Sequence, residues 1–173
     1  EVKLLAPVEP TKIVCIGLNY SEHVKESQSA DKNPDEPILF LKPPSALLGP
    51  GEKIIYPEMA ARVDYEAELG IVIGKECCNV AEVEAEDYIF GCTCVNDVTA
   101  RDLQKKDIQW TRAKAFDTFC PVGPWIVDNI KYEDLLVDSY LNGELRQSAR
   151  TSTMIFSVVK LVSFISKIMT LYP

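Results

Sequence analysis

Apolar and polar positions in residues 63–74 (VDYEAELGIVIG) follow two different patterns. In the first half, Asp64, Glu66 and Glu68 alternate with apolar or aromatic side chains, and the second half is apolar without interruption through Ile73. Alternation has the period of a β-strand and places the three carboxylates on one face. An uninterrupted apolar run is typical of a strand buried on both faces. The pattern therefore predicts a strand that carries carboxylates toward a buried region.

Several carboxylates on a strand that enters a buried region need their negative charges compensated. Two carboxylates about 6 Å apart repel each other by about 3 kcal/mol at an effective dielectric constant near 20. On a solvated face, which is the ordinary alternative, water would dissipate most of this energy. In a buried site the carboxylates need a cation, a raised pKa or a basic partner.

A third carboxylate follows another apolar stretch. Asp97 follows the apolar stretch IFGCTCV, which predicts a strand that can lie beside the one carrying Glu66 and Glu68. Three carboxylates without Cys or His suit a hard divalent cation such as Mg²⁺ or Mn²⁺. The pattern therefore makes Glu66, Glu68 and Asp97 candidate metal ligands, with a solvated acidic face as the alternative.

The remaining segments predict a chain richer in strands than in helices. Apolar or alternating runs predict strands at 12–18, 38–42, 92–97 and 119–127, and a turn followed by a strand at 49–57. Helical turns are expected at 19–27, 79–91, 98–106 and from Ser157, as N-cap, to about Thr170. Asn142-Gly143 predicts a β-hairpin over 139–147. Because strands and helices do not alternate regularly, a doubly wound α/β fold is excluded.

Composition and charge narrow the classes of protein. The chain has 173 residues, enough for one domain with a sizeable core, which we expect to cover 12–173 after a lead-in segment at 1–11. A net charge of −8 argues against a nucleic-acid partner but not against a small anionic substrate. No segment predicts a signal peptide or a membrane span, so the expected location is intracellular and cytoplasmic.

Four further side chains carry candidate chemistry. His23 is the only histidine, and Glu26, three residues on, shares its face if the segment is helical. A carboxylate beside an imidazole raises the pKa of the histidine and orients it as a general base. Arg101 could bind a substrate carboxylate, and Lys114 could neutralise an enolate or hold a metal-ligand carboxylate. The alternatives are an exposed histidine and ordinary ion pairs with some of the 26 acids.

Several segments, in order, resemble the fumarylacetoacetate hydrolase family. They are KIVCIGLNYSEHVKE, PILFLKPPSAL, VDYEAELGIVIGK, DYIFGCTCVNDVTARDLQ and AKAFDTFCPVGPWIV, with LNGELRQ and the last helix extending the similarity to the end. The resemblance implies an α+β, mostly β fold, a mixed β-roll with a few short helices, and usually a homodimer. It also implies Mg²⁺, or Mn²⁺ or Ca²⁺, bound by the carboxylates at Glu66, Glu68 and Asp97.

The resemblance also implies roles for other residues, position by position. The residues matching catalytic positions are His23, Glu26 and Lys114. Those matching substrate-contacting positions are Arg101, Gln104 and Lys42.

Two features distinguish this chain within the family. Fumarylacetoacetases proper have an additional acidic metal ligand near the position where this chain has Asn19, so the chain is more similar to the acylpyruvase and 2-hydroxyhepta-2,4-diene-1,7-dioate isomerase branch. The family also continues past the last helix into a Gly-Thr-Pro segment that completes the roll. This sequence stops at Pro173, so we expect a domain that lacks the family's last strands.

The resemblance implies a metal-dependent hydrolase or lyase that cleaves a C–C bond in a 2,4-dioxo or 2-oxo dicarboxylic acid. The metal would chelate the oxo-acid end and stabilise an enolate, while His23 and Glu26 activate water. One alternative is an isomerase or tautomerase that uses the same metal site and only moves a proton. A second alternative is a truncated, inactive dimerising module.

Overall fold

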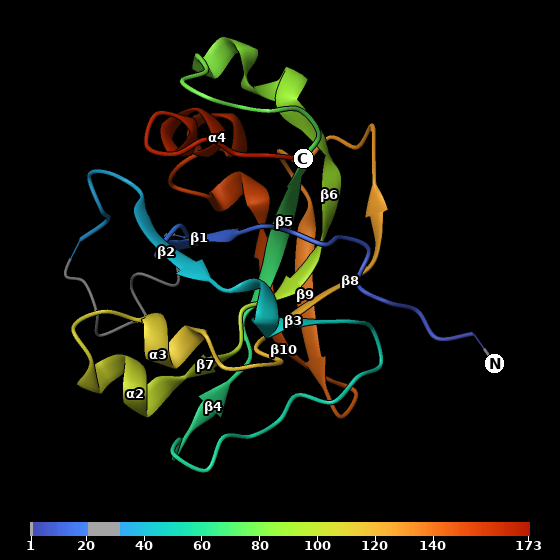
Figure 1. Ribbon diagram of the computed structural model, residues 1–173, viewed down its shortest axis with the longest axis vertical. Helices are drawn as coiled ribbons and strands as arrows, with labels where there is room; N and C mark the ends of the chain where they lie inside the picture. The colour runs from blue at the N-terminus through green and yellow to red at the C-terminus, as the bar shows by residue number, and fades with distance from the viewer. Residues whose placement is uncertain (1, 21–31) are drawn as a thin grey trace.

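The computed structural model describes residues 2–20 and 32–173, and it is mostly β with a few short helices (Figure 1). The largest sheet has the strand order β3-β8-β6-β5. Its strands are β3 (Leu47–Leu48), β8 (Cys120–Val127), β6 (Ile89–Asn96) and β5 (Ala67–Ile73). β3 runs parallel to β8, whereas β8 pairs antiparallel with β6 and β6 pairs antiparallel with β5, so the sheet is mixed. This confirms the predicted fold class.

Three two-stranded sheets accompany the largest sheet, and all three are antiparallel. They pair β1 (Ile13–Gly17) with β2 (Ile38–Lys42), β4 (Val63–Asp64) with β7 (Thr99–Ala100), and β9 (Leu136–Leu141) with β10 (Glu144–Arg150). The β9–β10 hairpin confirms the prediction for 139–147. Its turn residues Asn142 and Gly143 have φ angles of 53° and 82°, the left-handed values that a type I′ turn requires.

The helices are short. In residues 2–20 and 32–173 the α-helices are α2 (Arg101–Lys106), α3 (Thr111–Lys114) and α4 (Val158–Ser166). The 3₁₀ helices are η1 (Pro44–Ala46), η2 (Glu82–Tyr88) and η3 (Thr151–Thr153). Ser157 caps α4 as predicted, with its hydroxyl accepting from the Lys160 N–H at 3.4 Å.

Three predictions of local structure were wrong, two at the end of a helix and one for a whole strand. The helix expected to reach about Thr170 ends at Ser166, and the one expected to reach Gly91 ends at Tyr88, because Ile89 already begins β6. The strand expected within 49–57 is absent. There the Ile55 N–H donates to the Thr118 hydroxyl at 2.9 Å instead of to a neighbouring strand. An apolar run without a strand beside it cannot form a ladder.

Two hydrophobic clusters involve the helices. In one, α4 and η2 lie side by side (Figure 1), and Cys77, Val80 and Leu171 belong to the same cluster. In the other, Leu103 of α2 and Ala113 of α3 pack against buried side chains that include Val98 and Phe119. The second cluster lies at the end of β6 where Asp97 follows the strand, so it supports the region that carries the candidate site.

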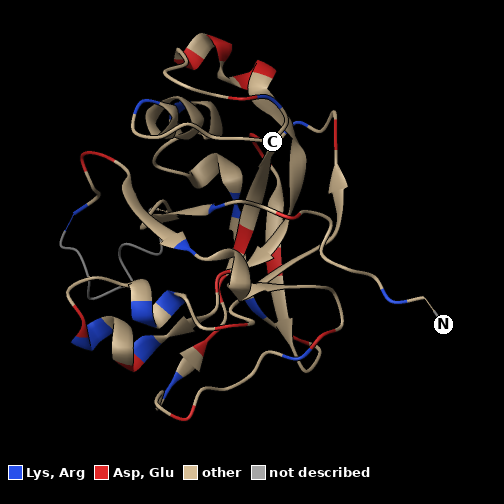
Figure 2. Cartoon of the chain, viewed as in Figure 1, with Lys and Arg blue, Asp and Glu red and all other residues tan. Residues whose placement is uncertain are grey.

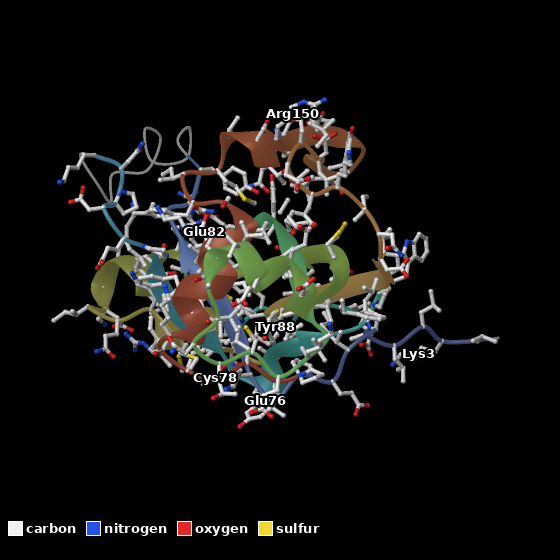
Figure 3. All side chains as sticks on the ribbon, turned by 90° about the horizontal axis from the view of Figure 1, so that it is seen from above. Lys3, Glu76, Cys78, Glu82, Tyr88 and Arg150 are labelled. Atoms are coloured by element: carbon white, nitrogen blue, oxygen red, sulfur yellow. The ribbon has the colours of Figure 1, made fainter. Side chains whose placement is uncertain are left out.

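Charged side chains gather unevenly over this framework. Figure 2 shows basic residues concentrated on α2 and α3 and acidic residues on η2. In the view from above, Lys3 lies on the N-terminal segment at one side of the molecule (Figure 3), and its ammonium pairs with Glu52 at 2.6 Å. Across the described residues, none of the helices has the length and apolar character that crossing a membrane requires.

Asn19 joins the end of the β1 segment to the segment before α4. Its buried side-chain amide donates to the Phe156 carbonyl at 3.1 Å and accepts from the Phe156 N–H at 2.9 Å.

Replacing Asn19 by Ala leaves both backbone groups without these partners. We expect Asn19→Ala to lower the free energy of unfolding by about 2 kcal/mol, measured by urea denaturation. The matched control Asn33→Ala, at an exposed position, should change it by less than about 0.5 kcal/mol. Equal effects of the two substitutions would contradict this role.

Candidate active site

Antiparallel pairing of β5 with β6 brings the three candidate carboxylates to one end of the sheet. Ala67 lies opposite Asn96, which places Glu66 and Asp97 next to each other just beyond the paired residues. The Asp97 N–H donates to the Glu66 carbonyl at 2.8 Å, and the Glu66 N–H donates to the Asn96 side chain at 3.0 Å. The register of this strand pair therefore explains a proximity that spacing along the sequence does not reveal.

Lys114, the last residue of α3, links two of these carboxylates. Its ammonium lies 2.8 Å from Glu66 Oε2 and 2.5 Å from Asp97 Oδ2, and its side chain is 3% exposed. Burial by itself would lower the pKa of Lys114, but the charges of Asp97 and Glu66 outweigh it and the pKa is raised. Lys114 is therefore held as a cation, and its charge offsets the repulsion between Glu66 and Asp97.

Lys42, at the end of β2, neutralises Asp97 from the other side. Its fully buried ammonium donates to the carbonyls of Val98, Lys114 and Phe119 at 2.8–3.0 Å, and lies 2.8 Å from Asp97 Oδ1. An ammonium has three N–H donors, and the three carbonyls use all of them. Asp97 Oδ1 therefore has an ion-pair contact but no hydrogen bond, in agreement with its being a buried atom without a donor.

Arg101, the first residue of α2, makes contacts to three polar side chains. Its guanidinium donates to Asp64 Oδ2 at 2.9 Å, to Gln104 Oε1 at 2.7 Å and to Glu66 Oε1. Burial would raise the pKa of Glu66, but Lys114 and Arg101 outweigh it and the pKa is lowered. Glu66 is therefore ionised and held from two sides.

Glu68 has a different environment from Glu66. Burial raises the pKa of Glu68 to about 8, and the neighbouring charges of Asp97 and Glu66 act in the same direction, opposed by Lys114. Among the residues that the structure describes, none donates a hydrogen bond to the Glu68 carboxylate. Glu68 is thus the carboxylate whose charge these neighbours compensate least.

Six of the candidate residues line one small pocket of about 50 Å³. They are Glu66, Glu68, Asp97, Arg101, Gln104 and Lys114, and the aromatic side chains of Phe40 and Trp110 line it with them. The three carboxylates also line a second, largely apolar cavity of about 900 Å³ between β1, β5 and α4. The carboxylates therefore stand where a polar pocket meets an apolar one.

The donor set fits a hard divalent cation in its chemistry. All three candidate ligands are carboxylates, Asp97 Oδ1 is a buried acceptor without a donor, and Glu68 is the carboxylate that the described residues compensate least. Their positions are not those of a closed metal shell: in residues 2–20 and 32–173 no three Cys, His, Asp or Glu side chains lie in metal-binding positions. The Lys114 ammonium, which contacts both Glu66 and Asp97, holds these two carboxylates in the present arrangement.

Lys42 does not line the small pocket. The N–H groups of its ammonium all donate to backbone carbonyls, which argues against direct contact with a substrate. His23 and Glu26 lie outside the described residues. Sequence reasoning gave no site role to Trp110, which lines the pocket, because nothing in its sequence context distinguishes it from a core aromatic residue.

Comparison with known proteins identifies the family. The family model "Fumarylacetoacetate (FAA) hydrolase C-terminal" matches residues 12–173. The chain therefore belongs to the fumarylacetoacetate hydrolase family, as its motifs predicted.

Individual relatives are named as enzymes of several kinds. The chain is 55% identical over 166 residues to a protein of Methanocaldococcus jannaschii, covering 96% of this chain and 69% of that protein. It is 44% identical to the oxaloacetate tautomerase YisK of Bacillus subtilis, covering 99% of this chain and 59% of the relative. It is also 44% identical to 2,4-didehydro-3-deoxy-L-rhamnonate hydrolase of a Sphingomonas strain, covering 94% of this chain and 58% of the relative.

Solved structures of similar proteins carry isomerase names. The 2-hydroxyhepta-2,4-diene-1,7-dioate isomerase from Mycobacterium marinum has a TM-score of 0.87 at 48% identity, covering 98% of this chain and 62% of that one. The 5-carboxymethyl-2-hydroxymuconate delta-isomerase from Mycobacterium smegmatis has a TM-score of 0.91 at 44% identity, covering 99% and 67%. This chain is thus similar to hydrolase, tautomerase and isomerase members of one enzyme family, and it spans only part of their length.

The Lys114 ion pairs allow a direct test of the site's electrostatics. Lys114→Met keeps most of the side-chain volume but leaves Glu66 and Asp97 without their shared cation. In buffer containing a chelator we expect this variant to lose about 3 kcal/mol of unfolding free energy in urea. The control Lys106→Met, on the exposed face of α2, should change it by less than about 0.5 kcal/mol. A Lys114→Met protein as stable as the parent would show that these carboxylates do not depend on the lysine.

Proposed function

We propose that this chain carries the active site of a divalent-metal-dependent enzyme that cleaves a C–C bond in a 2,4-dioxo or 2-oxo dicarboxylic acid. The observation that supports this most is the clustering of Glu66, Glu68 and Asp97 with Arg101, Gln104 and Lys114 around one pocket. The name of the Sphingomonas hydrolase, a family relative at 44% identity, is consistent with this class of reaction.

The proposed cation is Mg²⁺ or Mn²⁺, with Glu66, Glu68 and Asp97 as its protein ligands. Bound there, it would supply Lewis-acid polarisation of an oxo acid. The protein's own contribution is orientation: Arg101 has five N–H donors, of which three are used in contacts to Asp64, Glu66 and Gln104. The remaining two can bind a substrate carboxylate beside the cation site. The Lys114 ammonium adds positive charge at the same wall.

Proton transfer is assigned to the His23–Glu26 pair, on the strength of the resemblance. With Glu26 orienting the imidazole, His23 would take a proton from the water that attacks the substrate's distal carbonyl carbon. The bond between that carbon and its neighbour then breaks, and the electron pair stays with the oxo-acid fragment.

A second candidate function is an isomerase or tautomerase that moves a proton without breaking a C–C bond. The isomerase and tautomerase names of relatives at 44–48% identity favour this alternative. The pocket residues would keep the same roles, and only the fate of the proton would differ.

Metal binding is the first test of the proposal. Titrating the chelator-treated chain with Mn²⁺ in a calorimeter should give one site. Glu68→Gln, which removes one proposed ligand charge while keeping its size, should weaken binding by at least about 10-fold. The control Glu76→Gln, an exposed acid, should leave the affinity unchanged. If the chain binds no divalent cation, or if Glu68→Gln binds as tightly as the parent, the proposed metal site is wrong.

The His23→Ala variant separates the two functions. We expect it to retain Mn²⁺ affinity but to cleave an acylpyruvate about 10²–10⁴ times more slowly, with the loss in kcat rather than KM. The same assay includes oxaloacetate and a 2-hydroxydienoic diacid as substrates for proton transfer. A parent protein that only isomerises or tautomerises these acids would replace the cleavage function by the second candidate. A chain that binds metal but converts no substrate would support a dimerising or binding module.

A further inference from the structure

Gln147 connects the β9–β10 hairpin to the strand that carries the candidate ligands. Its Oε1 atom accepts a hydrogen bond from the Ala67 N–H at 3.0 Å and another from the Ser139 hydroxyl at 3.0 Å. Because a backbone N–H can only donate, the oxygen of the side-chain amide must face Ala67. Ser139, on the neighbouring strand, holds that oxygen in place.

The position of Gln147 in its strand is irregular. The pairing of β9 with β10 shifts between Leu145 and Gln147, which is the signature of a β-bulge. A bulge adds a residue to one strand and redirects the side chains beside it. Here the side chain that follows the irregularity leaves its own hairpin and reaches the first residue of β5.

Ala67 lies between two of the three candidate metal ligands, Glu66 and Glu68. Toward β6, the backbone at Glu66 is held by the Asn96 side chain and by the Asp97 N–H. On the other side, Gln147 holds the Ala67 N–H, at the point where the chain has left β4 and enters β5. The peptide that joins Glu66 to Ala67 is therefore fixed from two directions.

We propose that Gln147 is a positioning residue for the metal site: it fixes the backbone of Ala67 and thereby the directions in which Glu66 and Glu68 project. No motif in the sequence assigns it this role. The inference deepens the proposed function, since its consequence for metal affinity depends on the cation site. Groups that orient metal ligands typically change affinity by about 10–100-fold when they are removed.

Two substitutions of Gln147 distinguish a role in positioning the backbone from a role in filling space. Gln147→Leu keeps the approximate size but removes the acceptor, whereas Gln147→Glu keeps an acceptor oxygen for both Ala67 and Ser139. Glu144→Gln, an exposed change in the same hairpin, serves as the control. These three variants, Ser139→Ala and the parent are compared by amide hydrogen exchange at Ala67, Mn²⁺ titration calorimetry and thermal melting.

We expect the Ala67 amide of Gln147→Leu to exchange about fivefold faster or more in metal-free buffer, because it has lost its hydrogen-bond partner. We also expect its Mn²⁺ affinity to fall by about 10-fold or more, with little change in melting temperature. In Gln147→Glu, both the Ala67 exchange rate and the Mn²⁺ affinity should stay within about twofold of the parent values. Ser139→Ala should show a smaller effect in the same direction, because Gln147 keeps its bond to Ala67.

Three results would overturn the proposal: unchanged Ala67 exchange in Gln147→Leu, unchanged Mn²⁺ affinity despite faster exchange, or equal losses in Gln147→Leu and Gln147→Glu together with a lower melting temperature. Failure of the proposed function is separate, because it appears as a parent protein that binds no Mn²⁺. In that event the claim about metal ligands falls with it, and the Ala67 exchange rates alone decide whether Gln147 holds the β5 backbone.

Discussion

The ion-pair network around Asp97 and Glu66 is the constraint on which the arrangement of this part of the protein depends. Carboxylates withdrawn from water are costly unless opposite charges and hydrogen-bond donors meet them. Three basic side chains provide this compensation, and each comes from a different element: Lys42 from β2, Arg101 from α2 and Lys114 from α3. Satisfying the carboxylates therefore also fixes these three elements against the ends of β5 and β6.

Lys42 shows how far this coupling extends. Its three donors bind carbonyls after β6, at the end of α3 and before β8, so one buried side chain joins segments far apart in sequence. Breaking this arrangement would take this donor from three interior carbonyls and remove one of the two lysine cations beside Asp97, at a cost well above that of a single lost hydrogen bond. Two of the basic residues on α2 and α3, Arg101 and Lys114, lie close to the acidic end of β5 for the same reason. The compensation of the carboxylates and the placement of the short helices therefore depend on each other.

The sequence predicted much of this arrangement through local patterns and motifs. Alternation and apolar runs located β5 and most of β6, Asn142-Gly143 located the hairpin, and Asp97 was predicted at the end of its strand because the apolar run stops there. Local patterns do not contain the partners of Lys42 or of Gln147, since those contacts depend on strand register and on a bulge. They also failed at 49–57, where an apolar run has no neighbouring strand to pair with, and at the C-terminal ends of two helices, where tertiary context overrides propensity.

The central claim is that Glu66, Glu68 and Asp97 share one divalent cation. A crystal of the chain soaked in Mn²⁺, with data collected near the manganese absorption edge, tests it most directly. We expect a single strong anomalous peak within about 2.0–2.4 Å of a carboxylate oxygen from each of the three residues, with Lys114 displaced from its position between Glu66 and Asp97. An occupied manganese site elsewhere, or a site whose ligands omit Asp97, would contradict the account.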